Sequence, residues 1–298
     1  MTEKKFILDT DIGDDIDDAF ALSLLCSLAG KEIAGVTTVF RNTKKRAQLA
    51  KTLLAAAGFE NVPVYAGESF PYKEPFHLFG KDAENAKPEE SAPCQWTEEY
   101  AAAEYENDAV NFIAESAKKY GKDLVLFAVG PLTNIARAIE KEEAVKHIGA
   151  IYTMGGYFSK DQAEWNILCD PEAAQIVYSS GIPVYACGLD VTLRCTLEED
   201  LLQAFRDSKK DTNRLLICWL DRWKEFFGFE KSVMHDPLAV ACAFANICRF
   251  EKRYVKTSDT NRGAVEAHES QKDGTSPVYV AEDVNPSAFY RLIREQLL

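Results

Sequence analysis

The sequence has no long apolar run and no secretion signal. A helix that crosses a bilayer needs about 20 consecutive apolar residues, and the apolar runs here are far shorter. The first ten residues, MTEKKFILDT, lack the apolar core and small-residue cleavage site of a signal peptide and lead directly into a strand-like run. We therefore expect a cytoplasmic protein that does not act in a membrane.

Lysine and arginine are scarce relative to acidic residues: 34 against 47, for a formal net charge of −13. Phosphate contacts need clustered basic side chains, so nucleic acid is not an expected partner, and anionic membranes are disfavoured. The sequence also lacks the G-x-x-x-x-G-K-S/T pattern of a phosphate-cradling loop. These absences disfavour nucleic-acid and phosphate ligands.

Cysteines are present, but none of the eight forms a C-x-x-C pair with another. They are scattered through apolar segments, so we expect reduced thiols that pack as small hydrophobic residues. Their spacing does not predict a zinc site. The eight are Cys26, Cys94, Cys169, Cys187, Cys195, Cys218, Cys242 and Cys248.

Strand-like apolar runs alternate with helix-like segments along the chain. Near-continuous apolar strands separated by helices predict a parallel sheet covered on both faces. No linker or internal repeat interrupts the pattern, so we predict a single α/β domain over residues 1–298 with a mostly parallel central sheet. Two later strands, 253–259 and 276–284, are candidates for antiparallel additions, and residues 68–96 predict a long loop. The other expected strands are 5–10, 32–40, 62–67, 123–130, 147–156 and 182–188, and the expected helices are 17–30, 42–58, 104–121, 132–142, 170–181, 197–208, 212–226, 235–246 and 285–298.

Polar residues follow several of these strands. In open α/β sheets, ligands bind at the carboxyl ends of the strands. Asp9 and Asp11 stand at that end of the first predicted strand, Asn42 follows the second, and Asp190 follows the sixth. We expect these positions to converge on one rim of the sheet.

Six aspartates crowd the first of these corners, between an apolar strand and an apolar helix. Two carboxylates about 4 Å apart repel by roughly 4 kcal/mol at an effective dielectric of about 20, so a cation or a helix N-terminus has to offset their charge. Asp14 and Asp15 are better explained as solvated residues at a helix start, whereas Asp9, Asp11 and Asp18 abut apolar sequence. Oxygen-only ligands suit Ca²⁺ or Mg²⁺, although the spacing does not fit an EF-hand loop. The six are Asp9, Asp11, Asp14, Asp15, Asp17 and Asp18.

Two further corners place polar residues before apolar helices. His235 and Asp236 precede one helix, and Asp236 alone is equally well explained as a helix N-cap. Glu164 and Asn166 flank Trp165, as in an extended segment that points two polar groups the same way. That pattern favours a functional role for the two flanking residues.

Together, these three corners resemble the inosine-uridine preferring nucleoside hydrolases. The resemblance covers nearly the whole chain and implies a Rossmann-like nucleoside hydrolase fold, a homodimer or homotetramer, and a ribonucleoside substrate. It also implies Ca²⁺-dependent hydrolysis of the N-glycosidic bond to free base and ribose. The segments that carry it, in the family's order, are DTDIGDDIDDAFAL, VTTVFRNT, AVGPLTNIA, MGGYFSKDQAEWNILCDPEAA, GLDVT and HDPLAVA.

The same resemblance implies the metal ligands and catalytic residues. Asp11, Asp18, Asp236 and the carbonyl of Val129 would bind the catalytic Ca²⁺. Asp11 would also act as the general base toward a metal-activated water, and His235 would lie near the leaving base as a second catalytic residue. N-glycosidic cleavage builds positive charge on the ribose in an oxocarbenium-like transition state. A carboxylate-rich pocket stabilises that charge.

Substrate contacts follow from the resemblance as well. Asp17, Asn42, Glu164 and Asn166 would hold the ribose hydroxyls, and His235 would contact the base. The segment 219–234 is rich in Phe and Trp, which is more typical of helix packing than of a stacking pocket. A purine stacked on these rings is nevertheless a hypothesis, since the segment precedes His235.

The first motif departs from the family pattern. Ile12 stands where the family has Pro, and two extra residues precede the sequence DDA. The family's Asp-Asp pair therefore aligns either with Asp17–Asp18, which leads straight into the helix, or with Asp14–Asp15. We prefer the first register.

Two loops depart too, and two alternative functions remain. The loop before Glu164 lacks the Asn that many members use, and Phe79 stands in place of a loop His. A repurposed family member that binds Ca²⁺ and a riboside without turnover is therefore one alternative. The other is a haloacid-dehalogenase-type phosphatase, but Gly13 stands where that motif needs Thr or Val.

Overall fold

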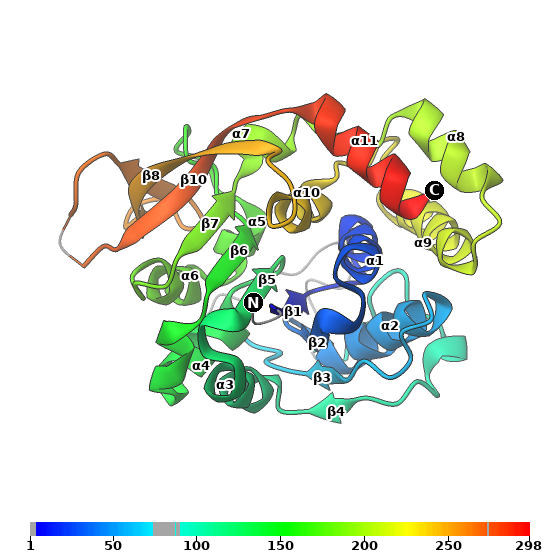
Figure 1. Cartoon of the computed structure of the whole chain (residues 1–298), viewed down its shortest axis with the longest axis horizontal. Coiled ribbons are helices and arrows are strands. Elements are labelled where there is room, and N and C mark those ends of the chain that lie inside the picture. Colours follow the sequence, from blue (N-terminus) through cyan, green and yellow to red (C-terminus); the bar gives the residue numbers. More distant parts are fainter. Residues whose placement is uncertain (1–3, 74–86, 88–89, 273) are drawn as a thin grey trace.

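The structure is a computed structural model that describes residues 4–73, 87, 90–272 and 274–298. Phe79 and most of the predicted long loop lie outside the described residues. Within the described part, ten strands form one sheet (Figure 1). They are β1 (Lys5–Thr10), β2 (Ile33–Thr38), β3 (Val64–Ala66), β4 (Glu106–Asn107), β5 (Leu124–Ala128), β6 (Ala150–Met154), β7 (Val184–Cys187), β8 (Cys248–Thr257), β9 (Val265–His268) and β10 (Pro277–Val284).

The sheet is parallel through its centre. Its order is β4-β3-β2-β1-β5-β6-β7-β10-β8-β9, and the pairs from β4 to β10 are parallel. The strand order reverses between β1 and β5, where Asp9 pairs with Ala128. Such a reversal leaves a crevice outside the carboxyl ends of the two strands. The predicted α/β fold is thus confirmed, while the single-domain assignment stays a prediction.

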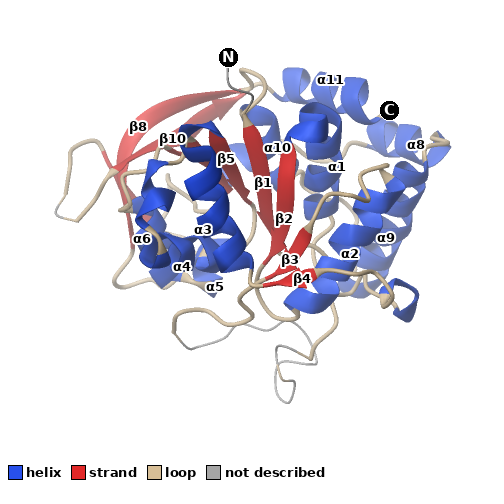
Figure 2. Cartoon of the chain, turned by 60° about the horizontal axis from the view of Figure 1, so that its bottom comes forward, coloured by secondary structure: helices blue, strands red, loops and turns tan. Residues whose placement is uncertain are grey.

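Helices cover both faces of the sheet. Figure 2 shows α3, α4 and α6 on one face and α1, α2, α9 and α10 on the other. Among the described residues, no helix combines the length and apolar character needed to cross a bilayer. The helices are α1 (Asp17–Ala29), α2 (Thr43–Ala56), α3 (Ala109–Tyr120), α4 (Thr133–Lys141), α5 (Trp165–Cys169), α6 (Pro171–Tyr178), α7 (Leu189–Thr192), α8 (Glu199–Asp207), α9 (Asp211–Phe227), α10 (His235–Cys242) and α11 (Pro286–Leu297).

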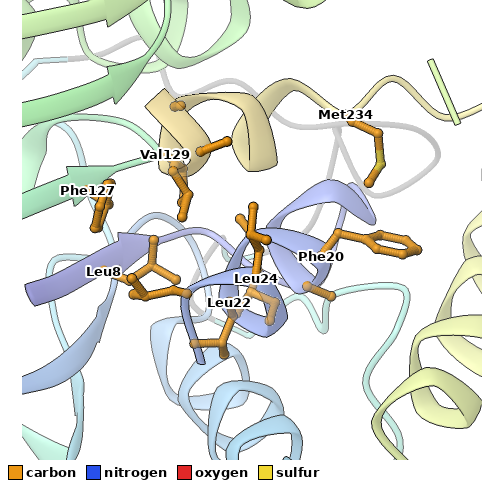
Figure 3. Close-up of a cluster of buried hydrophobic side chains, with 14 of the residues drawn as sticks. Leu8, Phe20, Leu22, Leu24, Phe127, Val129 and Met234 are labelled. Atoms are coloured by element: carbon orange, nitrogen blue, oxygen red, sulfur yellow. The ribbon is translucent and has the colours of Figure 1, made fainter. Parts of the chain in front are cut away.

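One apolar cluster fixes α1 against the sheet. Figure 3 shows Leu8 of β1 and Phe127 of β5 near Leu22 and Leu24 of α1, and all four side chains are buried. Full burial of each such side chain contributes about 1.5–3 kcal/mol. The start of α1, with its acidic residues, is therefore held rigidly beside the end of β1.

One local prediction was wrong, and another was confirmed in part. Residues 164–166 were expected to be extended, but Glu164 caps α5, because its carboxylate accepts hydrogen bonds from the amides of Asn166 (3.0 Å) and Ile167 (3.1 Å). Of the two later strands, β8 is antiparallel to its neighbours, as expected, whereas β10 is antiparallel to β8 but parallel to β7. Short elements without a clear period, β4, β9 and α7, were not predicted.

Candidate active site

A cavity of about 460 Å³ opens at the carboxyl ends of β1, β5 and β6. Its floor is acidic and its wall is aromatic. The floor includes Asp11, Asp17, Asp18 and Asp236, and most of the site residues predicted from the sequence line it. The topology thus brings together segments separated by more than 200 positions along the chain.

Two helix N-termini supply the acidic floor. Asp17 and Asp18 form the first turn of α1, and Asp236 is the second residue of α10. Single carboxylate oxygens of these three residues all lie within 4.8 Å of one another. The Asp17 carboxylate also accepts a hydrogen bond from the Asp236 amide (3.1 Å), which ties the two helices together.

Burial makes the charge of this floor costly. It raises the pKa of Asp17, Asp18 and Asp236 well above the usual range, and neighbouring carboxylates raise these pKa values further. Burial also raises the pKa of Asp11 to about 7. A cation would remove this penalty, and a donor set made of oxygens alone fits a hard cation such as Ca²⁺ or Mg²⁺.

The predicted metal ligands are only partly grouped. Asp18 and Asp236 belong to the close group, and Asp17, which was predicted to contact ribose, joins them. Asp11 and Val129 line the same cavity, and the Val129 carbonyl accepts a hydrogen bond from Asn166 Nδ2 (2.9 Å). The carbonyl keeps a second lone pair for a cation, so the roles of Asp11 and Val129 as ligands stay predictions.

The position of Asp14 supports the preferred register. Its carboxylate forms ion pairs with Arg46 Nη2 (2.7 Å) and Arg41 Nη1 (3.3 Å), so it is already neutralised by cationic side chains. Asp17 and Asp18 instead face Asp236. The Asp17–Asp18 pair is therefore better placed than Asp14–Asp15 to bind a metal.

The sequence analysis missed Arg46, a fully buried cation of α2. Its guanidinium donates hydrogen bonds to the carbonyls of Asp11, Ile12 (3.1 Å) and Phe40 (2.8 Å). It thus fixes the backbone that carries Asp11. Nothing in the local sequence KKRAQLA distinguishes Arg46 from neighbouring lysines, because its environment comes from Phe40 and from the segment after β1, which the fold brings to α2.

Asp9 has a structural environment. Its Oδ1 accepts hydrogen bonds from Thr37 Oγ1 (2.5 Å) and Asn134 Nδ2 (2.7 Å), which link β1 to β2 and α4. Its Oδ2 is buried without a hydrogen-bond partner among the described residues, and burial raises the pKa of Asp9 to about 7. We infer that Asp9 fastens the strands beneath the cavity.

Gly130 lets the Asp11 carboxylate into the crevice between β1 and β5. A Cβ atom at position 130 would lie 2.7 Å from Asp11 Oδ1 and 3.0 Å from the Asp11 amide nitrogen. The first distance is too short for a real contact, and the second is tighter than most real contacts. A larger residue at position 130 would therefore force the Asp11 carboxylate to shift.

Glu164 and Asn166 both line the cavity, but much of their hydrogen-bonding capacity is used within the protein. Glu164 accepts from three backbone amides, including that of Gly156 (3.0 Å). Asn166 donates to the carbonyls of Val129 and Met154 (3.2 Å). They fix the loop at the end of β6, and their contact with ribose stays a prediction.

His235 lies on the cavity wall as the first residue of α10. Its Nδ1 is 2.7 Å from Thr192 Oγ1, and burial lowers the pKa of the imidazole to about 4. A positive charge at a helix N-terminus is also unfavourable. At neutral pH, His235 is therefore an uncharged hydrogen-bonding group.

Asn42 lies apart from these residues. It is the N-cap of α2, where its Oδ1 accepts a hydrogen bond from the Lys45 amide (3.1 Å). The described residues that line the cavity do not include Asn42. Its predicted contact with ribose is thus untested, and its visible role is the helix cap.

Aromatic side chains form the outer wall. Trp223 and Phe227, near the end of α9, line the cavity together with Phe229. The rings of Phe227 and Phe229 lie nearly parallel, 4° apart, with centroids separated by 5.8 Å. Trp219, by contrast, is fully buried. Helix packing was the favoured interpretation of the aromatic residues in segment 219–234. It fits Trp219, whereas Trp223, Phe227 and Phe229 line the cavity.

Comparison with known proteins identifies relatives along the whole chain. A profile of the family described as inosine-uridine preferring nucleoside hydrolase matches residues 6–291. The chain is 30% identical over 288 residues to a probable uridine nucleosidase 2 from Oryza sativa subsp. japonica, covering 92% of this chain and 83% of the relative. It is also 30% identical over 311 residues to the pyrimidine-specific ribonucleoside hydrolase RihA of Photobacterium profundum, covering 99% and 98% of the two chains.

Solved structures share the fold. A purine-preferring ribonucleoside hydrolase from Gardnerella vaginalis superposes with a TM-score of 0.77 at 29% identity, over 98% of each chain. The plant nucleoside hydrolase PpNRh1 gives a TM-score of 0.76 at 24% identity, over 99% of this chain and 98% of that one. The names of these relatives include both pyrimidine and purine preferences.

Proposed function

The chain belongs to the family of inosine-uridine preferring nucleoside hydrolases, and on this premise we propose that it hydrolyses the N-glycosidic bond of ribonucleosides with the help of Ca²⁺. The observation that carries the proposal is the buried acidic floor beneath an aromatic wall. This floor suits a hard cation and a cationic transition state, and the wall suits a flat base. The family match also argues against the phosphatase alternative.

The residues of the floor divide the work. Asp11, Asp18, Asp236 and the Val129 carbonyl would hold the Ca²⁺ ion. The ion would lower the pKa of a water molecule and orient the ribose hydroxyls. Asp11, fixed through its backbone by Arg46, accepts the proton of the attacking water. The remaining carboxylates stabilise positive charge as it develops on the ribose ring.

The wall acts on the leaving base. His235 is uncharged at neutral pH because burial lowers its pKa. It would therefore form a hydrogen bond with the base as a neutral imidazole, and not donate a proton as an imidazolium. Thr192 orients the ring through Nδ1. The aromatic rings would hold the base by stacking, and His235 would aid its departure.

The first test is release of free ribose from inosine, uridine, adenosine and cytidine, with Ca²⁺ and after chelation. We expect chelator-sensitive release from at least one nucleoside, since the floor is costly without a cation. Ca²⁺ binding by calorimetry without ribose release from any of them would instead favour the non-catalytic riboside-binding alternative.

Stability of the metal-free protein should fall as pH rises from about 4 to about 7. Burial raises the pKa of Asp9 and Asp11 to about 7, so in this range the folded state binds protons there that the unfolded state has released. The contribution of these two groups to the free energy of unfolding is therefore present at low pH and is lost as pH rises through the folded pKa. Melting temperatures measured by calorimetry in the presence of a chelator should therefore decrease as the pH is raised.

Added Ca²⁺ should raise the melting temperature more at pH about 8 than at about 5, because protons compete with the cation for carboxylates. Mg²⁺ at the same concentration provides the comparison. Melting temperatures that are unchanged by either cation at high pH would contradict a metal site on this floor.

Phe229→Ala should lower kcat/KM about 2- to 12-fold, mainly through KM, because stacking of an aromatic pair contributes about 0.5–1.5 kcal/mol. Phe226→Ala is a matched control: the two rings are 56% and 58% exposed, but among the described residues Phe229 lines the cavity and Phe226 does not. Equal losses in both variants would show that Phe229 does not contact the base.

A further inference from the structure

A second cluster of metal-ligating side chains lies away from the acidic floor. The sulfur atoms of Cys187, Cys242 and Cys248 all lie within 4.8 Å of one another. They come from three different elements: the last residue of β7, the last residue of α10 and the first residue of β8. The spacing along the chain gave no sign of this cluster, because only the fold brings the three segments together.

The sulfur separation fits a shared cation. Cys187 Sγ and Cys242 Sγ are 3.9 Å apart. Zinc–sulfur bonds of about 2.3 Å at tetrahedral angles place two sulfurs about 3.8 Å apart, whereas a disulfide needs about 2.05 Å. The thiols are therefore spaced as ligands of one ion, without the closer approach that a covalent bond requires.

The surroundings place one cationic side chain near the cluster. Cys187 is buried, while Cys242 and Cys248 are partly exposed. Arg194 Nη2 donates to the carbonyl of Val284 (3.1 Å), the strand partner of Cys248. Its Nη1 also forms an ion pair with Asp283 Oδ1 (2.6 Å), so its charge is shared between that carboxylate and the cluster.

We propose that Cys187, Cys242 and Cys248 form a binding site for one soft divalent cation of the Zn²⁺ class, separate from the acidic floor. Each sulfur forms one bond to the metal, and each thiol that is protonated loses its proton, so binding releases up to three protons and changes no oxidation state. Thiolate ligands select soft cations, and carboxylates select hard ones. The two sites therefore take different ions.

A cation bound at this site would link β7, α10 and β8 next to the cavity. Cys242 ends the helix that begins with His235 and Asp236. Cys187 directly precedes Gly188 and Leu189, and Leu189 lines the cavity. A cation held between β7, α10 and β8 would therefore stabilise the wall of the site without contacting substrate.

The test is titration of the full chain with Cd²⁺ in saturating Ca²⁺ under reducing conditions. Thiolate ligation produces ultraviolet charge-transfer absorption that carboxylate ligation does not. We expect saturation at one Cd²⁺ per chain and near-complete loss of this absorption in Cys242→Ser and Cys248→Ser. Cys26→Ser and Cys218→Ser are the controls, one for a buried and one for an exposed thiol, and they should keep it.

Proton release from the unaltered protein gives a second readout that does not depend on the folding of any variant. About two to three protons per Cd²⁺ are expected in weak buffer at neutral pH, because each protonated thiol releases its proton on binding. Absorption that survives in Cys242→Ser, release of at most one proton, or a Cys187–Cys242 disulfide seen as the loss of two hydrogens by mass would each overturn the site.

Discussion

Asp11→Asn is expected to lower kcat for ribonucleoside hydrolysis by about 10³-fold or more. The change removes the general base and one predicted oxygen ligand while keeping the side-chain shape. Asp11 lines the cavity floor, where its carboxylate would accept the proton of the attacking water. Steady-state ribose release at saturating Ca²⁺ measures the effect.

Asp190→Asn is the matched control. This carboxylate accepts hydrogen bonds from the amides of Phe158 (2.8 Å) and Ser159 (3.0 Å), and it is absent from the described residues that line the cavity. Its rate should stay within about threefold of the unaltered protein, because the side chain lies outside the cavity lining, although the amide keeps only one of the two hydrogen bonds. An Asp11→Asn protein with rates near those of Asp190→Asn would rule out Asp11 as the base.

Measurements of Ca²⁺ affinity distinguish Asp18, which is proposed only as a metal ligand, from Asp11, which is proposed as both a ligand and the general base. Asp18→Asn should weaken Ca²⁺ binding in calorimetry and lose turnover with it, because Asp18 belongs to the close carboxylate group. If Asp15→Asn instead lost Ca²⁺ while Asp18→Asn kept it, the alternative register would be correct.

Arg46→Met should lower the free energy of unfolding by about 3–5 kcal/mol, the usual cost of removing one partner of a buried ion pair. The substitution leaves the Asp14 carboxylate without its closest cation. It also removes the donor to the carbonyls of Asp11, Ile12 and Phe40. Chemical denaturation, with the slope checked for two-state behaviour, gives the value.

Two further variants interpret that loss. Arg206→Met removes an exposed ion pair with Asp221, so it should cost less than about 1 kcal/mol. Adding Asp14→Asn to Arg46→Met should restore part of the stability, because the buried charge is then removed as well. If Arg46→Met lowered the free energy of unfolding no more than Arg206→Met does, Arg46 would not stabilise the acidic floor of the cavity.

Local sequence was enough for much of the architecture. Apolar runs such as residues 5–10 and 123–130 placed the buried strands, and the DDAFAL pattern placed the start of α1. The carboxyl-end rule then located the rim. These features are encoded locally, because strand and helix periods and helix caps depend on residues only a few positions apart.

The tertiary structure decided which of these residues meet. It placed Asp17 with Asp18 and Asp236, buried Arg46 beneath Asp11, and turned the expected extended residues 164–166 into a capped helix. It also gathered Cys187 and two distant cysteines into one cluster. Such contacts depend on how helices pack across a twisted sheet, so residues more than 200 positions apart become neighbours with no trace in the local pattern. The sequence by itself determined the order along the chain of most strands and helices and the acidic corner at the end of β1, whereas the packing of α1, α2 and α10 decided which charges share one cavity.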